Sequence, residues 1–234
     1  GGKGWLRAGD YQTMIREVSG QLSFDGARVS LAPLRVVTSD HDLQATGTFG
    51  LLSTPAEWNV AFDSTTDVGA VLANWPAVPK AEGVARLSGS VSGPLGSPHV
   101  TVRATANEMT LAGTTARRVV AEAAIASTGD VTVTRATAEA LGGRLELTGR
   151  LRGDEAGDEG LLTLSGANLT PAMALAGLDA PLAGAASGTL RFRGDVGAPA
   201  GWDASGDLTV RPAGGVGTPV SGRVALALRD GRWR

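Results

Sequence analysis

The feature that most constrains this chain is a regular alternation of apolar and polar residues, clear at residues 131–134, 145–151 and 190–193. Successive side chains of a strand point to opposite faces, so this period predicts strands with one apolar face and one wet face. Turn signals such as Asp25-Gly26 and Gly206-Asp207 separate these segments, which favours short antiparallel hairpins. We therefore predict an all-β chain of roughly sixteen to eighteen strands, each about 5 to 7 residues long.

Two short segments break the alternation and predict helices. Residues 67–75 and 170–177 each begin at a capping residue, Asp67 or Thr170, continue with apolar residues at helical spacing, and end at a Pro or a Gly. Each is expected to form about two turns, packed on the sheet or at its edge. No other segment of the sequence favours a helix.

The chain also resembles itself at long range. Val18-Ser19-Gly20 recurs 202 positions later as Val220-Ser221-Gly222, and several Gly and Pro positions recur at half that offset, among them Gly83 with Gly184 and Pro98 with Pro199. Such a period predicts imperfect repeats of 101 to 102 residues, at 1–117 and 118–219, with a third beginning at 220–234. We expect the chain to be a segment of a longer repetitive protein, with neighbouring units on each side.

Composition limits both the core and the partners. One Tyr, four Phe and five Trp leave Val, Leu and Ala to build the apolar face, so the core is expected to be thin. The 21 basic and 23 acidic residues are balanced, which gives no support to a nucleic-acid partner. The absence of Cys excludes disulfides and a thiol nucleophile.

Catalytic motifs are missing as well. The sequence contains no Gly-x-Ser-x-Gly, no phosphate-binding loop and no His-Glu-x-x-His, so we predict that it is not an enzyme and needs no metal or cofactor. We interpret Ser39-Asp40-His41-Asp42 as a polar hairpin edge and His99 as a turn residue. The carboxylates of residues 154–159 are expected to be solvated at a hairpin tip. We interpret Arg117-Arg118 and the pair Arg191 and Arg193 as devices for solubility and edge protection rather than as a phosphate site.

The positive signal is the apolar face itself. It must be hidden by a second sheet, by curling of the same sheet, or by a ligand, and periodicity alone is also compatible with an ordinary sandwich or solenoid core. The candidate lining residues are Val29, Leu31, Leu34, Val36, Val131, Val133, Leu145, Leu147, Leu151, Leu162, Leu164, Leu190, Phe192, Val224, Leu226 and Leu228.

Three segments carry a resemblance to a known family. Residues 83–98, with Gly-Pro-Leu-Gly-Ser-Pro at their end, residues 119–122, and residues 136–149, with a Leu-Gly-Gly-Arg-Leu turn before a Thr-Gly strand end, resemble the bacterial TamB/AsmA-like proteins. The same pattern of Gly residues, short spacers and segments of alternating apolar and polar residues extends over nearly the whole chain.

The resemblance implies a long, strongly curled antiparallel sheet, the β-taco or repeating β-groove of bridge-like lipid transfer proteins, with aliphatic residues on its concave side. It implies phospholipid acyl chains as ligands, carried between the inner and outer membranes of a Gram-negative bacterium. The parent protein would lie in the periplasm, anchored in the inner membrane by a segment outside this chain. An outer-membrane barrel partner and a role in outer-membrane protein assembly are implied for other parts of that protein.

Two further functions stay open. A structural or adhesive β-solenoid, such as an autotransporter passenger, shares the Gly content and the alternation, but its coils repeat at about 20 residues rather than at 101. A carbohydrate-active enzyme would need carboxylates clustered on one face, and the sequence does not assemble them.

Overall fold

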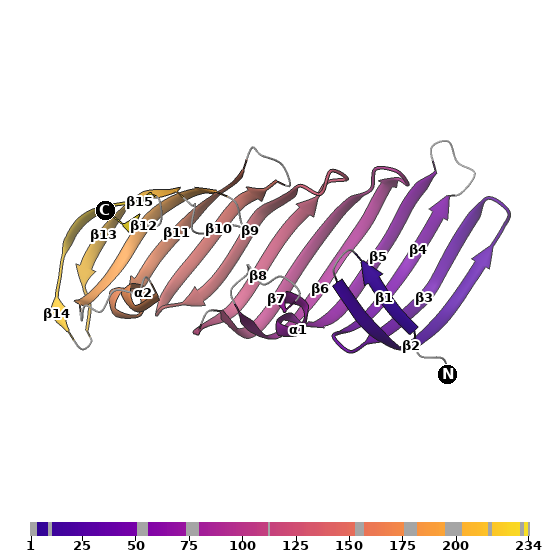
Figure 1. The fold of residues 1–234 in the computed structure, drawn as a ribbon, viewed down its shortest axis with the longest axis horizontal. Coiled ribbons are helices and arrows are strands. Elements are labelled where there is room, and N and C mark those ends of the chain that lie inside the picture. Colours follow the sequence, from indigo (N-terminus) through magenta and orange to yellow (C-terminus); the bar gives the residue numbers. More distant parts are fainter. Residues whose placement is uncertain are drawn as a thin grey trace.

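The computed structural model is dominated by a single β-sheet (Figure 1). It describes residues 4–8, 11–50, 56–73, 80–111, 113–152, 157–175, 182–194, 203–214, 217–229 and 232–233. The prediction of an all-β chain with an antiparallel sheet and two short helices is confirmed. The strands are β1 (Gly4–Ala8), β2 (Tyr11–Phe24), β3 (Arg28–Thr38), β4 (His41–Gly50), β5 (Glu57–Asp67), β6 (Ala81–Pro94), β7 (His99–Leu111), β8 (Thr114–Ile125), β9 (Val131–Ala140), β10 (Gly143–Leu151), β11 (Asp158–Asn168), β12 (Leu182–Gly194), β13 (Asp203–Pro212), β14 (Thr218–Pro219), β15 (Gly222–Arg229) and β16 (Arg232–Trp233).

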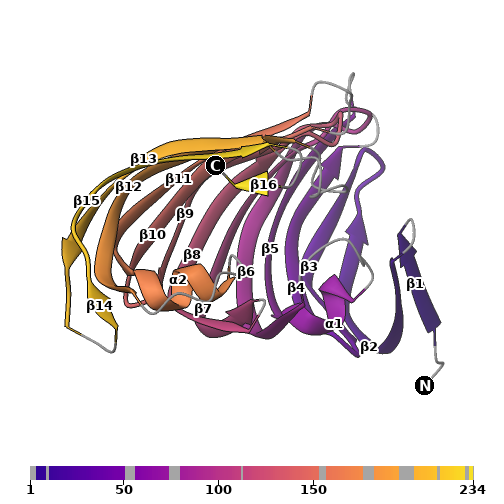
Figure 2. The ribbon, with the colours of Figure 1, turned by 60° about the vertical axis from the view of Figure 1, so that its left-hand side comes forward.

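The strands follow one another across the sheet in the order of the sequence. From β1 to β13, and on through β15 and β16, each strand pairs antiparallel with the next, while β14 pairs parallel with the start of β12. Strands β1 and β16 lie at opposite ends of this path and do not pair, so the sheet is open (Figure 2). Strands β2 to β13 contain 9 to 14 residues, so the predicted length of 5 to 7 residues was wrong. Runs of Ala, Gly and Thr continue the strands beyond the segments in which alternation is visible in the sequence.

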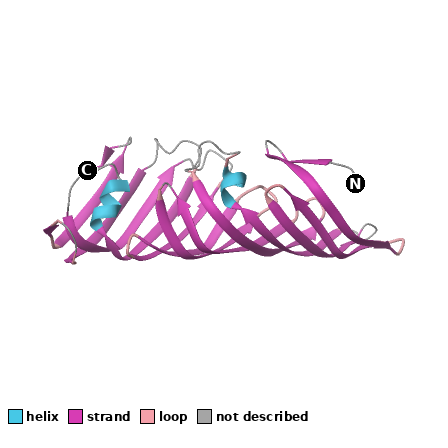
Figure 3. Cartoon of the chain, turned by 90° about the horizontal axis from the view of Figure 1, so that it is seen from below, coloured by secondary structure: helices cyan, strands magenta, loops and turns pink. Residues whose placement is uncertain are grey.

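Both helices lie on the same face of the sheet (Figure 3). Helix α1 (Val68–Leu72) follows β5, and helix α2 (Leu169–Leu175) follows β11. The Asp67 carboxylate caps α1 by accepting a hydrogen bond from the Ala70 amide at 3.1 Å, as a capping residue should. Helix α1 is shorter than predicted, and the predicted terminators at residues 74–75 and 176–177 lie outside the described residues.

The elements recur in the same order along the chain. Strands β3, β4 and β5, helix α1, and strands β6 and β7 have counterparts in β9, β10 and β11, α2, and β12 and β13. Each α-helix thus follows the third strand of its series and packs mainly on the fourth, α1 on β6 and α2 on β12. The exact repeat boundaries at residues 117 and 219 stay a prediction.

The two-residue turn between β9 and β10 shows how the sequence sets the register. Leu141 and Gly142 have φ values of 55° and 72°, the left-handed backbone that the tightest hairpins require. The backbone amide of Asn168, at the end of β11, donates a hydrogen bond to the Leu141 carbonyl at 2.7 Å and ties the turn to β11. Ala140 and Gly143 therefore pair directly, and this turn sets the register of the two strands as far as Leu147, beyond which a bulge shifts it.

Candidate functional site

All sixteen candidate lining residues lie on one face of the sheet, which we call the apolar face. Directly paired residues of an antiparallel sheet share a face, so the pairing register can be followed from strand to strand. One such row crosses twelve strands without a polar residue: Leu34, Ala45, Phe62, Gly89, Val102, Ala123, Val133, Gly149, Gly160, Phe192, Ala204 and Leu228. The apolar face is therefore continuous along most of the sheet.

The two neighbouring rows of this face are also largely apolar. The next row interrupts its apolar residues only at Ser64: Val18, Val36, Leu43, Ser64, Leu87, Ala104, Ala121, Ala136, Leu147, Leu162, Leu190, Gly206 and Leu226. A third row is apolar throughout: Leu22, Leu31, Gly47, Val60, Val91, Val100, Ile125, Val131 and Leu151. Their side chains are small or aliphatic, so the face presents nearly equivalent positions from one strand to the next.

No second sheet covers the apolar face in the described part of the chain. Of the sixteen candidate residues only Leu164 is buried, and Val224 is 41% exposed. The chain exposes 14381 Å², against about 9,800 Å² for a compact monomeric protein of this mass. The face is thus neither the core of a sandwich nor an ordinary outer surface, and the expected thinness of the core is visible in the structure.

The best-packed part of the apolar face lies beside α2. Leu164, Ala167, Ala186, Leu208 and Val210 form a buried cluster, against which Leu169 of the helix packs. The sequence identified Leu164 but not Leu208 or Val210, although Leu208-Thr209-Val210 alternates as clearly as the segments that were chosen. This cluster fixes one end of the face and leaves most of the remainder half-exposed.

Two glycines of the apolar face make room for aromatic rings. A Cβ placed on Gly160 would lie 2.1 Å from Cζ of Phe192, and one on Gly89 would lie 2.8 Å from Cζ of Phe62. Each ring therefore lies across the neighbouring strand rather than standing off the sheet. Phe62 belongs to the face but was missed from the sequence, although residues 59–63 alternate.

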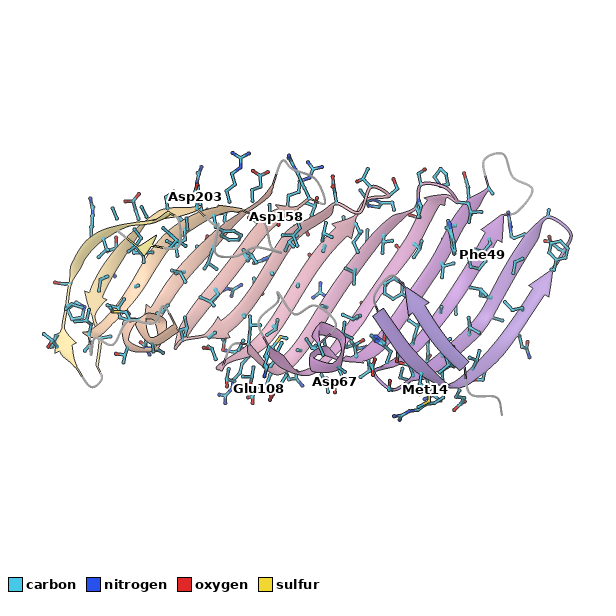
Figure 4. All side chains as sticks on the ribbon, in the orientation of Figure 1. Met14, Phe49, Asp67, Glu108, Asp158 and Asp203 are labelled. Carbon is cyan, nitrogen blue, oxygen red and sulfur yellow. The ribbon has the colours of Figure 1, made fainter. Side chains whose placement is uncertain are left out.

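The opposite face is polar and is tied by ion pairs between adjacent strands. Arg35 contacts Asp42 with N–O distances of 2.9 and 2.7 Å, and Arg117 contacts Glu108 at 2.9 Å. The hydrogen bond from Arg35 holds the pKa of the Asp42 carboxyl below its usual range. These exposed ion pairs contribute little to stability, but they identify the solvent-exposed face of the sheet. The side chains of both faces are drawn in Figure 4.

The polar residues 39–42 do not converge on one point in the structure. His41 Nδ1 lies 2.9 Å from Thr66 Oγ1, while the next residue, Asp42, is engaged with Arg35. Among the described residues no three His, Asp or Glu side chains gather as a metal ion would require. No described helix is both long enough and apolar enough to cross a membrane.

One expectation about the acidic segment was wrong. Asp158 is only 5% exposed rather than solvated, because its Oδ1 accepts a hydrogen bond from the Arg152 amide at 2.7 Å and closes the hairpin between β10 and β11. Glu159, the next residue, is exposed. Asp154 and Glu155 lie outside the described residues.

The His41 environment predicts a pH dependence of stability. Burial lowers the pKa of His41 below its ordinary value of 6.5, although Asp40 opposes the shift. The unfolded chain therefore binds the proton more tightly, and stability is lost as the pH falls below about 6.5. Urea unfolding at pH 7.5 and pH 5.5 should show a larger loss for the wild type than for His41→Asn. The same change at the exposed His99 is the matched control, and equal losses in all three proteins would contradict the prediction.

We compared the chain with family models, curated proteins and solved structures. None of them matches it. The candidate site therefore rests on the geometry above, and its decisive property is a continuous, largely uncovered apolar face on an open antiparallel sheet.

Proposed function

We propose that the chain is a non-enzymatic segment of a lipid-conducting bridge, in which the apolar face curves into a groove that holds phospholipid acyl chains. The observation that carries the proposal is the set of apolar rows that cross the sheet without a covering layer from any of the residues that the structure describes. Monomeric soluble proteins rarely expose contiguous apolar patches beyond a few hundred Å² unless the patch binds something. An acyl chain is a suitable occupant, because the rows offer no hydrogen-bonding side chain except at Ser64.

The free energy of burial favours binding of an acyl chain and also allows the chain to move along the groove. Each methylene transferred from water to the apolar face contributes about 0.8 kcal/mol, so an acyl chain of ordinary length is held firmly. The rows repeat from strand to strand with Ala, Val, Leu and Gly, so a chain that shifts by one strand loses one set of contacts and gains a similar set. Headgroups would remain in water at the rim of the sheet.

The resemblance to TamB/AsmA-like proteins extends this proposal to a location. On this proposal the parent protein would lie in the periplasm of a Gram-negative bacterium, anchored in the inner membrane by another segment, and would carry phospholipid between the two membranes. Support of outer-membrane protein assembly through a barrel partner would belong to parts outside this chain. The antiparallel pairing of successive strands differs from the stacked parallel coils of a β-solenoid, so no structural observation favours the adhesive passenger.

Lipid occupancy tests the proposal directly. The wild-type chain, purified from bacterial membranes without added detergent, should carry phospholipid that organic extraction and mass spectrometry detect. The double variant Leu87→Asp/Leu147→Asp places two carboxylates in one apolar row, and we expect at least a fivefold loss of phospholipid per chain because each buried charge opposes an acyl chain.

The matched control for lipid occupancy is Ser90→Asp/Ser165→Asp, which adds the same charge to the polar face. Ser90 lies on β6, as Leu87 does, and Ser165 lies on β11, next to the strand of Leu147. This control should retain wild-type phospholipid within about twofold, and circular dichroism should show that both double variants keep their strand content. Absence of phospholipid from the wild type, or an equal loss in the control, would contradict the proposed function.

A further inference from the structure

One hollow of the sheet is lined mainly by residues of the polar face, together with Phe192 and Leu228 of the apolar face. Its volume is about 850 Å³, and its walls come from β10 to β13 and β15. Two adjacent polar-face rows line it, one containing Arg191 and Ser205 and the other Arg150 and Arg193. The hollow lies close to a long rim of the sheet, where Figure 4 places Asp158 and Asp203.

Some arginines that line other hollows of this face are neutralised by a carboxylate on an adjacent strand. Arg103 pairs with Glu122 in one hollow, and Arg117 pairs with Glu108 in another. Ion pairing of this kind leaves no excess charge for a ligand. Arg191 and Arg193 in the hollow at β10 to β13 have no such partner among the described residues.

Positive charge exceeds negative charge in the large hollow. Arg150 contacts Asp130 at 3.0 Å, and Glu159 is 3.9 Å from Arg152, so these groups are engaged. The strand register places no carboxylate opposite Arg191, whose paired residues are Leu161 and Ser205.

Arg193 is similarly left without an ion pair. It lies opposite Glu159 and Asp203 in the register, but no ion pair between described residues includes Arg191 or Arg193. Both guanidinium groups are exposed on the same face, two residues apart on β12. With Asp203 as the remaining carboxylate, these two arginines leave a local charge of about +1.

In place of the solubility role expected for Arg191 and Arg193 from the sequence, we propose that this hollow is a binding site for the phosphodiester group of a small organic phosphate. The two arginines would hold the phosphate, with the Ser205 hydroxyl beside them. The planar guanidinium fork matches the oxygens of a phosphate and binds them in pairs. A phosphodiester carries one negative charge, which suits the local charge better than a dianionic monoester facing Asp203. The volume lies in the range of sites for small organic ligands, so it has room for the groups esterified to the phosphate.

A titration with a soluble headgroup tests the site without reference to lipid transport. The probe is glycerophosphoglycerol, a phosphodiester without acyl chains, and the readout is isothermal titration calorimetry at low ionic strength. Saturable binding with one site per chain is expected. Arg191→Ala/Arg193→Ala should weaken binding at least tenfold, and Arg191→Lys/Arg193→Lys should weaken it several-fold, because the charge remains while the paired hydrogen bonds are lost.

The control Arg86→Ala/Arg103→Ala removes two arginines of the same face that have carboxylate partners, and it should bind the probe as the wild type does. Flotation with phosphatidylglycerol vesicles distinguishes the source. If the wild type binds the vesicles and Arg191→Ala/Arg193→Ala does not, the ligand is a headgroup in a bilayer. If the wild type binds the soluble probe but not the vesicles, the ligand is a free phosphodiester. No saturable binding of either probe, equal weakening in the control, or a preference for a single-stranded oligonucleotide would overturn the proposal. Failure of the lipid-extraction test would leave this site standing, because its probe has no acyl chain.

Discussion

Replacing Leu164 by Asp is expected to destabilise the sheet by about 3–5 kcal/mol, because the substitution opens a cavity and buries a carboxylate without a partner. Leu164 is 9% exposed and packs within the cluster that Leu169 of α2 covers. The measurement is urea unfolding followed by circular dichroism, together with hydrogen exchange to locate the change. Faster exchange should be confined to β10 to β15, around the cluster.

Ser165→Asp is the matched control for Leu164→Asp. Ser165 is the next residue on the same strand, lies on the polar face, and pairs with Arg144 across the strands. The added carboxylate stays in water beside an arginine, so stability should change by no more than about 0.5 kcal/mol. A similar loss in both variants would show that Leu164 is not part of a packed cluster.

Gly160→Val is expected to destabilise the sheet by about 2–3 kcal/mol through overpacking. The Cβ of any larger residue would occupy the position of the Phe192 ring, which lies 2.1 Å from it. Either the ring rotates away from the apolar face or the two strands separate locally. Thermal unfolding and the aromatic signals of Phe192 in an NMR spectrum should report the change.

A double-mutant cycle separates the ring contact from other effects at Gly160. Phe192→Ala removes the obstacle, so Gly160→Val should destabilise that background by about 1–2 kcal/mol less than it destabilises the wild type. Additive effects of the two substitutions would contradict the proposed packing of Phe192 over Gly160. Gly149→Val offers no equivalent cycle, because its close neighbours are backbone atoms of Glu159 and Gly160.

Alternation in the sequence was sufficient to predict the two faces of the sheet. In residues 145–151 every second side chain is apolar or Gly, and the structure places Leu145, Leu147 and Leu151 on the apolar face as expected. Short-range turn chemistry was correct at Leu141-Gly142, which forms the predicted hairpin, but wrong at Gly206-Asp207, which lies within β13 and pairs on both sides. Both signals are local, and local signals survive in a sheet whose strands pair with their sequence neighbours.

Strand lengths and register were harder to predict, because small residues hide the period. In β8 the segment Arg117-Arg118-Val119-Val120 shows no alternation, and Arg118 adopts a φ of 49° at a shift in register. A bulge adds one residue on one strand and exchanges the faces beyond it, which a pattern of period two cannot represent.

Contacts between strands were also beyond the sequence. The pairing of Phe192 with Gly160 depends on a register fixed by turns many residues away, so neither residue identifies the other. The buried Asp158 accepts a hydrogen bond from the Arg152 amide across a hairpin, a contact that no local pattern reveals. The charge of the hollow at Arg191 depends on Leu161 and Ser205 lying opposite that residue, whereas Glu122 lies opposite Arg103, and this too is a property of register.

The neighbour-to-neighbour order of the strands has a consequence for how the protein folds. From β2 to β13 each strand finds its partners immediately before and after it in the sequence, so pairing closes only short loops. Growth can begin at any hairpin and proceed outward in both directions, as in other quasi-one-dimensional proteins. Stability then accumulates from interfaces between adjacent strands, and a strand that fails to pair divides the sheet into two segments that each keep their own structure.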